Sequence, residues 1–197
     1  MKMNDQTTAV WRRDRYSRRW CVSMVLLLAG LCVNPSRAFS AGNERSVRVG
    51  GDVSNPGDWT VKRLKQQFAA EIRQIHYASQ GQPHVSNCVA LLSLLKAAGA
   101  PTELKMDPAA DPKMKNAPLR IVIVIQGRDG YTVVFSLPEL LSQIGNKPVW
   151  LALDEDGGPL SERDGPVKLV VPDDAKPARG VHGIAAVRVE DMGHGSH

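Results

Sequence analysis

The first forty residues constrain the fold more than any other part of the sequence. They have the pattern of an export leader, so the folded domain is expected only in the residues that follow them. Five arginines between Arg12 and Arg19 precede an apolar segment over residues 20–33, and small residues follow it up to Ser40. The apolar segment is too short to cross about 30 Å of hydrocarbon comfortably as a helix. Together these features predict a signal peptide over residues 1–40.

The residues just before the apolar segment are similar to a twin-arginine export signal. Paired arginines follow a serine in residues 16–20, although Cys21 and Val22 replace the large apolar residues usual after the pair. Two export routes stay open, because the twin-arginine route carries folded proteins and the general route carries unfolded chains. Two alternatives to a signal peptide that ends at Ser40 also stay open: an uncleaved N-terminal anchor, and a lipoprotein attached at Cys32, which the large Leu31 disfavours.

Loss of the leader changes both the charge and the cysteine content. Residues 1–40 hold seven of the 25 Lys and Arg and two of the 20 Asp and Glu, so the net charge falls from +5 to zero. The basic charge thus gives no support for nucleic-acid binding. Cys21 and Cys32 also leave with the leader, and Cys88 alone can form no internal disulfide. We expect a periplasmic or secreted protein with no stable membrane span after leader removal.

The mature chain is predicted to form one domain over residues 41–192, with a flexible tail over 193–197. The whole chain is 43% hydrophobic and 5% aromatic, which is ordinary globular composition. Expected strands lie near residues 47–49, 72–77, 121–125, 131–135, 149–153, 167–171 and 184–189. Because they do not alternate regularly with helices, we predict an α+β fold with a mixed β-sheet.

Two helices are expected in the first half of this domain. Thr60 is a good N-cap, and Leu64 and Phe68 follow it at helical spacing, which predicts a helix of about ten residues. The leucine-rich residues 88–98 predict a buried helix that starts at Cys88 and stops at Gly99.

Four stretches carry a family likeness: residues 47–64 (VRVGGDVSNPGDWTVKRL), 88–101 (CVALLSLLKAAGAP), 127–141 (GRDGYTVVFSLPELL) and 151–189, which holds Gly-Pro-x-x-Leu-Val-Val-Pro. In this order they resemble the molybdopterin-binding domain of sulfite-oxidase-type oxidoreductases, in its small standalone exported form. The likeness covers essentially the whole mature chain. It implies a mixed-sheet domain that cradles a pterin carrying molybdenum, held by the pterin dithiolene sulfurs and one protein cysteine.

The cysteine that this resemblance requires is not matched. In catalytic relatives it ends a strand well upstream of the leucine-rich helix, and here that place is near His76, which offers no sulfur. Cys88 lies about a dozen positions away, so we do not assign it as the metal ligand. It is expected to be either a buried structural thiol or a reactive thiol activated by a helix N-terminus. Catalytic residues and protein ligands to a metal are therefore left unassigned.

The resemblance implies seven cofactor-binding residues: His76, His84, Arg128, Asp129, Tyr131, Arg179 and His182. Residues 128–131 match the family's Asp-Gly-Tyr element, where a guanidinium and backbone amides suit a phosphate. The same residues are also compatible with a plain hairpin turn. Arg163 and Lys168 would join Arg179 and His182 around the pterin phosphate, or else be exposed charges. The histidines are equally compatible with structural roles.

Two functions of different classes follow. The first is an exported molybdopterin-dependent oxidoreductase, whose redox activity is doubtful without the cysteine, acting between a small-molecule substrate and a periplasmic redox partner. The second is a cofactor-free periplasmic module on the same fold that binds a ligand or another protein. The sequence has no motif of a serine hydrolase, zinc protease, phosphate-binding loop or dinucleotide fold. The resemblance is therefore the only route from this sequence to a chemistry.

Overall fold

The computed structural model describes residues 45–104 and 117–193, all within the unit Ala41–His197. The predicted signal peptide over residues 1–40 lies outside the described residues, as do residues 194–197 of the predicted tail. Two sheets and three short α-helices form the described part. The fold is α+β and consists mostly of strands, as the sequence predicts.

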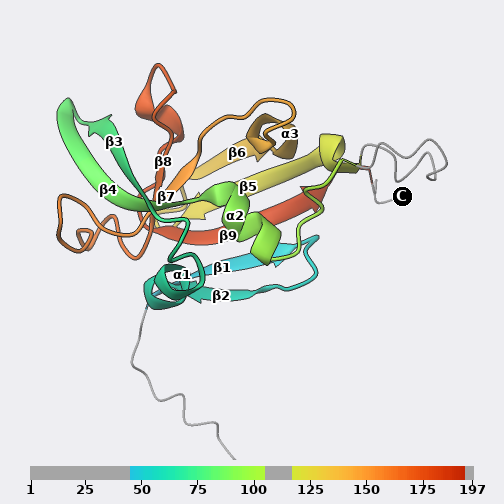
Figure 1. The fold of residues 1–197 in the computed structure, drawn as a ribbon, viewed down its shortest axis with the longest axis horizontal. Coiled ribbons are helices and arrows are strands. Elements are labelled where there is room, and N and C mark those ends of the chain that lie inside the picture. Colours follow the sequence, from blue (N-terminus) through green and yellow to red (C-terminus); the bar gives the residue numbers. More distant parts are fainter. Residues whose placement is uncertain (1–44, 105–116, 194–197) are drawn as a thin grey trace, which may run out of the picture. The chain divides into compact units, whose positions relative to one another are not determined.

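The larger sheet has five strands in the order β2-β1-β9-β5-β6 (Figure 1). Its strands are β1 (Ser46–Gly51), β2 (Gly57–Thr60), β5 (Ile121–Gly127), β6 (Thr132–Ser136) and β9 (Ile184–Asp191). β1 and β9 run parallel, whereas the other neighbours are antiparallel. The prediction of a mixed sheet is therefore confirmed.

The smaller sheet has four antiparallel strands in the order β3-β4-β7-β8. Its strands are β3 (Arg73–Ser79), β4 (Gln82–Ala90), β7 (Trp150–Ala152) and β8 (Lys168–Val170). β3 and β4 form a long hairpin whose turn consists of Gln80 and Gly81, both with positive φ, 53° and 78°. That backbone geometry is the one that two-residue hairpin turns favour. β3 and β8 are left as the two edges of the sheet.

The helices are α1 (Val61–Gln67), α2 (Leu91–Ala97) and α3 (Leu137–Leu140). Thr60 caps α1 as predicted, since its Oγ1 accepts a hydrogen bond from the Arg63 backbone N–H at 3.2 Å. Among the described residues no helix is long and apolar enough to cross a membrane.

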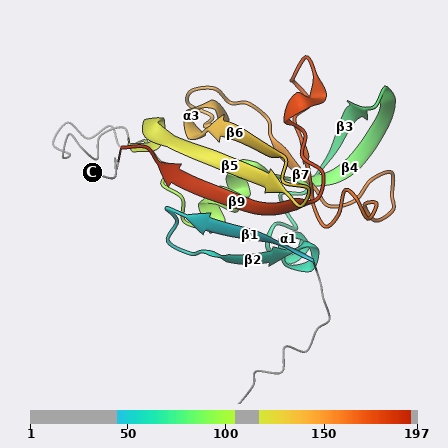
Figure 2. The same cartoon turned by 180° about the vertical axis from the view of Figure 1, so that it is seen from behind.

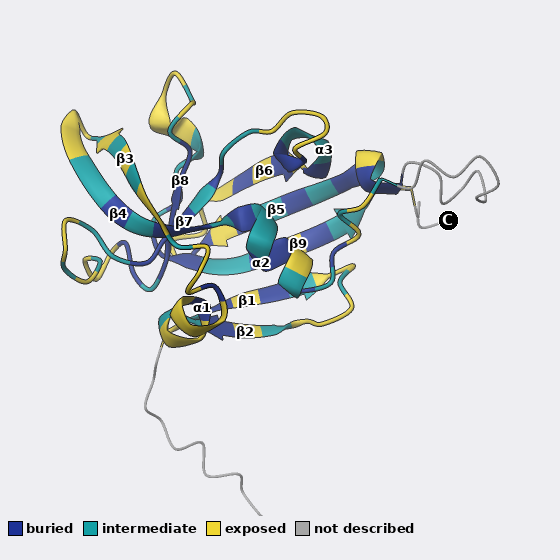
Figure 3. Ribbon diagram, in the orientation of Figure 1, coloured by how far each residue is buried: buried dark blue, intermediate teal, exposed yellow. Residues whose placement is uncertain are grey.

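One hydrophobic core holds the larger sheet and the helices together. Alternate residues of β5, among them Ile123 and Ile125, are fully buried on one face of the sheet, and α2 buries Leu94 and Leu95 against that face. Figure 3 shows the buried residues along β5, β9 and β1 beneath α2. Seen from behind, no helix of the described part covers the opposite face of the sheet (Figure 2).

The predicted helix over residues 88–98 is wrong at its start. Cys88 lies in β4, which continues to Ala90, and α2 begins only at Leu91. Cys88 pairs with Arg73 on one side and with Ala152 on the other, so neighbours on both sides hold it in a strand. The idea of a thiol activated by a helix N-terminus loses its structural basis.

Candidate ligand-binding site

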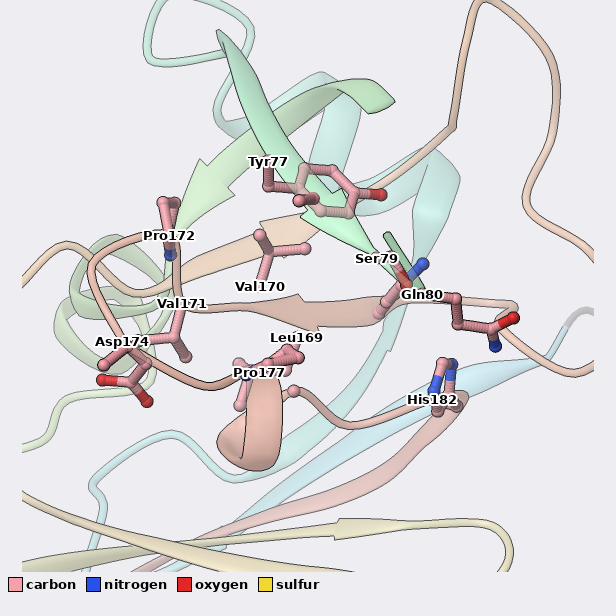
Figure 4. A pocket seen from close by; sticks show the side chains of 14 residues that line it. Tyr77, Ser79, Gln80, Leu169, Val170, Val171, Pro172, Asp174, Pro177 and His182 are labelled. Atoms are coloured by element: carbon pink, nitrogen blue, oxygen red, sulfur yellow. The ribbon is translucent and has the colours of Figure 1, made fainter. Parts of the chain in front are cut away.

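A cavity of ≈ 290 Å³ lies between the two edges of the smaller sheet (Figure 4). β3 and its turn line one side, β8 lines another, and the loop around the 3-10 turn Pro177–Arg179 lines a third. No residue of β4 or β7 lines the cavity. The sheet therefore curves so that both edges border one space, whose volume is close to the lower end of the range for small-molecule pockets, about 300–1,000 Å³.

The cavity has an apolar wall and a polar end. The wall is formed by side chains of β8 and the following loop: Leu169, Val170, Val171, Pro172, Ala175 and Pro177. Tyr77, Lys168 and His182 supply polar groups, and so do Ser79, Gln80 and Asp174 (Figure 4 labels all of these except Lys168). The lining is thus about as polar as it is apolar, and a concave site that combines an apolar wall with convergent polar groups is suited to a small ligand.

Five side chains form a hydrogen-bonded series, called here the polar chain: Tyr77, Glu155, Lys168, Asp164 and His182. The Tyr77 hydroxyl donates to Glu155, and the Lys168 ammonium donates to Glu155 at 2.8 Å and to Asp164 at 3.2 Å. Asp164 also lies 2.6 Å from Nδ1 of His182. The Lys168 side chain is only 7% exposed, so two carboxylates balance one largely buried cation.

The charges of the polar chain are fixed by these contacts. Burial alone would raise the pKa of Asp164, but hydrogen bonds from His182 and Lys168 outweigh it and lower the pKa. Burial would likewise lower the pKa of Lys168, and its hydrogen bond with Glu155 leads the contacts that raise it instead. Burial, followed by the hydrogen bond with Glu155, raises the pKa of Tyr77 to about 12. At neutral pH the chain thus holds two carboxylates, an ammonium and a neutral phenol.

His182 has its tautomer set by Asp164. The ionised carboxylate can only accept hydrogen bonds, so Nδ1 of His182 carries the proton that it shares with Asp164. Nε2 makes no hydrogen bond to a described residue, and His182 lines the cavity. One imidazole nitrogen therefore remains available to a ligand.

Of the seven residues implied by the resemblance, the structure brings His84 and His182 to the polar chain. His84 lies across from Tyr77 in the hairpin, with ring centroids 5.8 Å apart, and its Nδ1 is 2.8 Å from Asp156. His76 is exposed and alternates with Tyr77 along β3, so it lies on the opposite face of the hairpin.

The structure places Arg128, Asp129 and Tyr131 in the turn between β5 and β6. Asp129 accepts a hydrogen bond from the Tyr131 backbone N–H at 2.9 Å, and the Tyr131 hydroxyl donates to the Ala178 carbonyl at 2.6 Å. Arg128 donates to the backbone carbonyls of Glu162, at 2.8 Å, and Gly165. These hydrogen bonds connect the turn to two neighbouring loops of the protein. They are compatible with the alternative in which residues 128–131 form a plain hairpin turn.

Arg179 is occupied by carboxylates. Its Nε and Nη2 donate to Asp174 at 2.8 and 2.7 Å, and its Nη1 donates to Glu139 at 3.1 Å. These contacts, led by the hydrogen bonds from Arg179, lower the pKa of Asp174 to about 2. The guanidinium also lies over the Phe135 ring, 4.6 Å from its centroid. Its donors are therefore taken up by carboxylates of the protein itself.

The residues present do not fit a molybdenum-bearing pterin. Cys88 is completely buried beside Ala152 and Val170 and does not line the cavity, so its thiol is not placed to reach a group bound there; burial also raises the pKa of the thiol to about 12. The guanidinium groups of Arg128 and Arg179 are engaged as described. Among the described residues, no group of three or more His, Cys, Asp and Glu side chains is placed to hold a metal ion.

Sequence reasoning missed three members of the polar chain as site residues: Tyr77, Glu155 and Asp164. Lys168 offered the clearest signal, since it is a single charge within the apolar run of residues 167–171. A charge in such a strand requires a buried partner, but the sequence does not say which acid supplies it.

Comparisons with known proteins assign no family to this chain. No protein-family model matches the chain, and no curated protein matches it significantly.

Proposed function

We propose that this chain is an exported, cofactor-free binding module that holds a mainly apolar ligand group in the cavity between β3 and β8. The observation that carries the proposal is the cavity itself, with an apolar wall and one free imidazole nitrogen at its polar end. The side chains of Tyr77, Lys168 and Asp174 in its lining are already engaged by neighbouring residues of the protein. Such a site favours binding and orientation over bond-making chemistry.

The chemistry of the polar chain argues against a nucleophile at this site. Lys168 is protonated and donates to two carboxylates, so its nitrogen has no free electron pair. The hydroxyl of Tyr77 is held neutral by its raised pKa. Ser79 lines the cavity but makes no hydrogen bond to a histidine among the described residues. The molybdopterin-dependent oxidoreductase is therefore the second candidate, carried only by the family resemblance.

The finer fold assignment, a domain of the sulfite-oxidase molybdopterin-binding type, belongs to the same proposal. It is supported by the four stretches in their order and is compatible with an α+β domain that contains a mixed sheet. Export to the periplasm is proposed from residues 1–40. Changing Arg18 and Arg19 to Lys tests the route, because it should stop export if the folded protein is carried.

The binding proposal is tested by screening a small-molecule fragment library against the mature protein with NMR chemical-shift mapping. We expect hits whose shifts cluster on Val170, Val171 and His182. Ala175→Trp fills the exposed rim of the cavity and should abolish these shifts. Ala178→Trp is the matched control, since Ala178 is exposed in the same loop but does not line the cavity. Hits that are absent, or that survive Ala175→Trp unchanged, would contradict the proposal.

A further inference from the structure

We propose that the cavity takes a small neutral ligand that joins an apolar group to a hydroxyl or a similar hydrogen-bond donor, and that this donor binds Nε2 of His182. The inference rests on the proposed function, because it names the class of ligand for the same cavity. Three observations carry it: the fixed position of the imidazole, the balance of charge along the cavity wall, and the volume of the cavity.

The imidazole of His182 is held in place through its neighbours in the chain and through its own ring. On one side, the Val181 carbonyl accepts a hydrogen bond from the Leu169 backbone N–H at 2.8 Å. On the other side, the Gly183 backbone N–H donates to the Asp164 carbonyl at 3.0 Å. The carboxylate of Asp164 then binds Nδ1 of the ring at 2.6 Å. A ligand therefore meets a nitrogen whose position is set before binding, which lowers the cost of ordering the site.

The free nitrogen of this ring is a hydrogen-bond acceptor. An ionised carboxylate can only accept hydrogen bonds, so Nδ1 carries the proton and the neutral ring has its lone pair on Nε2. Ser79 and Gln80 also line the cavity (Figure 4), but a hydroxyl and an amide can each donate or accept, so neither selects between ligands. Selection for a ligand that donates therefore depends on His182.

The charges that border the cavity are balanced within the protein. Lys168 lines the cavity, and its ammonium donates to Glu155 and Asp164, which do not line it. Asp174 also lines the cavity, and its carboxylate is paired with Arg179 and with a lysine. An anionic ligand would thus meet no uncompensated cation in the described lining, and a cationic ligand would lie against the Lys168 ammonium. A neutral ligand avoids both costs.

The volume of the cavity limits the size of the ligand. Its ≈ 290 Å³ corresponds to the space of about ten water molecules, since each takes about 30 Å³ in the liquid. The wall that includes Val170, Val171 and Pro177 suits a single ring or a branched aliphatic group. One apolar ring with a short arm that ends in a hydroxyl is a ligand of this size and polarity.

The test compares probes that share a benzyl group: benzyl alcohol, benzyl methyl ether, phenylacetate and benzylamine. The alcohol and the ether both have an acceptor oxygen, but only the alcohol has a donor. Titrations of the mature protein, followed by NMR chemical shifts, give the dissociation constants. We expect benzyl alcohol to shift Val170 and His182, and the two charged probes to bind at least about tenfold more weakly, because their charge would be left unpaired.

His182→Phe keeps a ring of similar size and removes Nε2. It should lower the ratio of alcohol affinity to ether affinity about fivefold, corresponding to roughly 1 kcal/mol for one lost hydrogen bond. The ratio cancels the difference in hydrophobicity between the two probes. His76→Phe is the matched control, because His76 is exposed and does not line the cavity. It should leave the ratio unchanged.

Asp164→Asn tests where the ring proton lies. The asparagine oxygen should stay with the Lys168 ammonium, which leaves the amide N–H₂ facing Nδ1 of His182 and moves the ring proton to Nε2. The ring can then donate to either probe, so the ratio should fall to the value found for His182→Phe. If this variant does not fold, the imidazole nitrogen shifts of the unmodified protein decide: Nδ1 should be protonated, and Nε2 should respond to benzyl alcohol.

The outcomes separate this inference from the proposed function. Fragment hits at the cavity without binding of benzyl alcohol, or an affinity ratio that His182→Phe leaves unchanged, would overturn the donor inference and leave the binding module standing. Tighter binding of phenylacetate or benzylamine than of the alcohol would also overturn it, because the preferred ligand would then be charged. If neither the fragments nor the benzyl probes bind, both proposals fail.

Discussion

The ammonium nitrogen of Lys168 lies 2.8 Å from Oε1 of Glu155, and both side chains are largely withdrawn from solvent, with 7% and 19% exposure. Asp164 completes the environment of the same ammonium at 3.2 Å. Breaking a buried ion pair of this kind is costly, because removing one partner leaves the other charge buried and uncompensated.

Lys168→Met should therefore lower the free energy of unfolding by about 3 kcal/mol, because Glu155 and Asp164 lose their shared cation. Urea denaturation measures this change. Lys62→Met, at an exposed position of α1, is the matched control and should change stability by less than about 0.5 kcal/mol. Equal effects of the two substitutions would mean that the buried pair is not formed in solution.

The lowered pKa of Asp174 predicts that the protein becomes less stable in acid. Its pKa of about 2 lies below the ordinary value of 3.8, so its contribution is present above the ordinary value and is lost as the pH falls from about 4 toward 2. Asp174→Asn should cost up to about 2 kcal/mol at neutral pH and progressively less below about pH 4. Urea titrations over this pH range test it. A difference that does not change with pH would be inconsistent with the Arg179 contacts.

The cysteine offers a chemical test of burial. Because the thiol of Cys88 is completely buried and its pKa is raised to about 12, we expect almost no reaction with a thiol reagent such as 5,5′-dithiobis(2-nitrobenzoic acid) at pH 8 in the native mature protein. Full reaction should follow in denaturant. Fast labelling of the native protein would show a reactive thiol and revive a chemical role for it.

Two glycines with positive φ allow the cost of backbone strain to be measured separately from the cost of steric overlap. Gly51 and Gly130 have φ of 86° and 84°, but a Cβ on Gly51 would overlap the backbone of Val189, whereas one on Gly130 meets nothing within 4 Å. Gly130→Ala should cost about 1 kcal/mol from backbone strain alone. Gly51→Ala should cost about 1–3 kcal/mol more. Equal thermal or urea stabilities would contradict the close approach of β1 and β9.

The parts of the fold that follow local patterns could be predicted from the sequence. Thr60 caps a helix because its hydroxyl and the residues after it suffice to start one, and the β5–β6 hairpin follows from two apolar runs around a glycine turn. Residues 88–90 were predicted as helix because the leucines that follow dominate the pattern. Their strand conformation comes from pairing with β3 and β7, which no local window contains.

The candidate site was less predictable for the same reason. His182 and Lys168 are visible in the sequence as charges near the final strands, but their hydrogen-bond partners, Glu155 and Asp164, come from the loop between β7 and β8. Tyr77 is 78 residues from Glu155 along the chain. β2 was missed altogether, because Gly57 and the residues before it have turn composition, and pairing with β1 makes a strand of residues 57–60.

The central claim, that this fold works as a binding module without molybdopterin, is tested most directly by the metal and pterin content of the mature protein. The full precursor is expressed in a molybdate-fed bacterial host, and the protein is purified from the periplasm. We predict far less than one molybdenum atom per chain and no pterin fluorescence after oxidation, while fragment binding at the cavity persists. Stoichiometric molybdenum together with pterin would contradict the account.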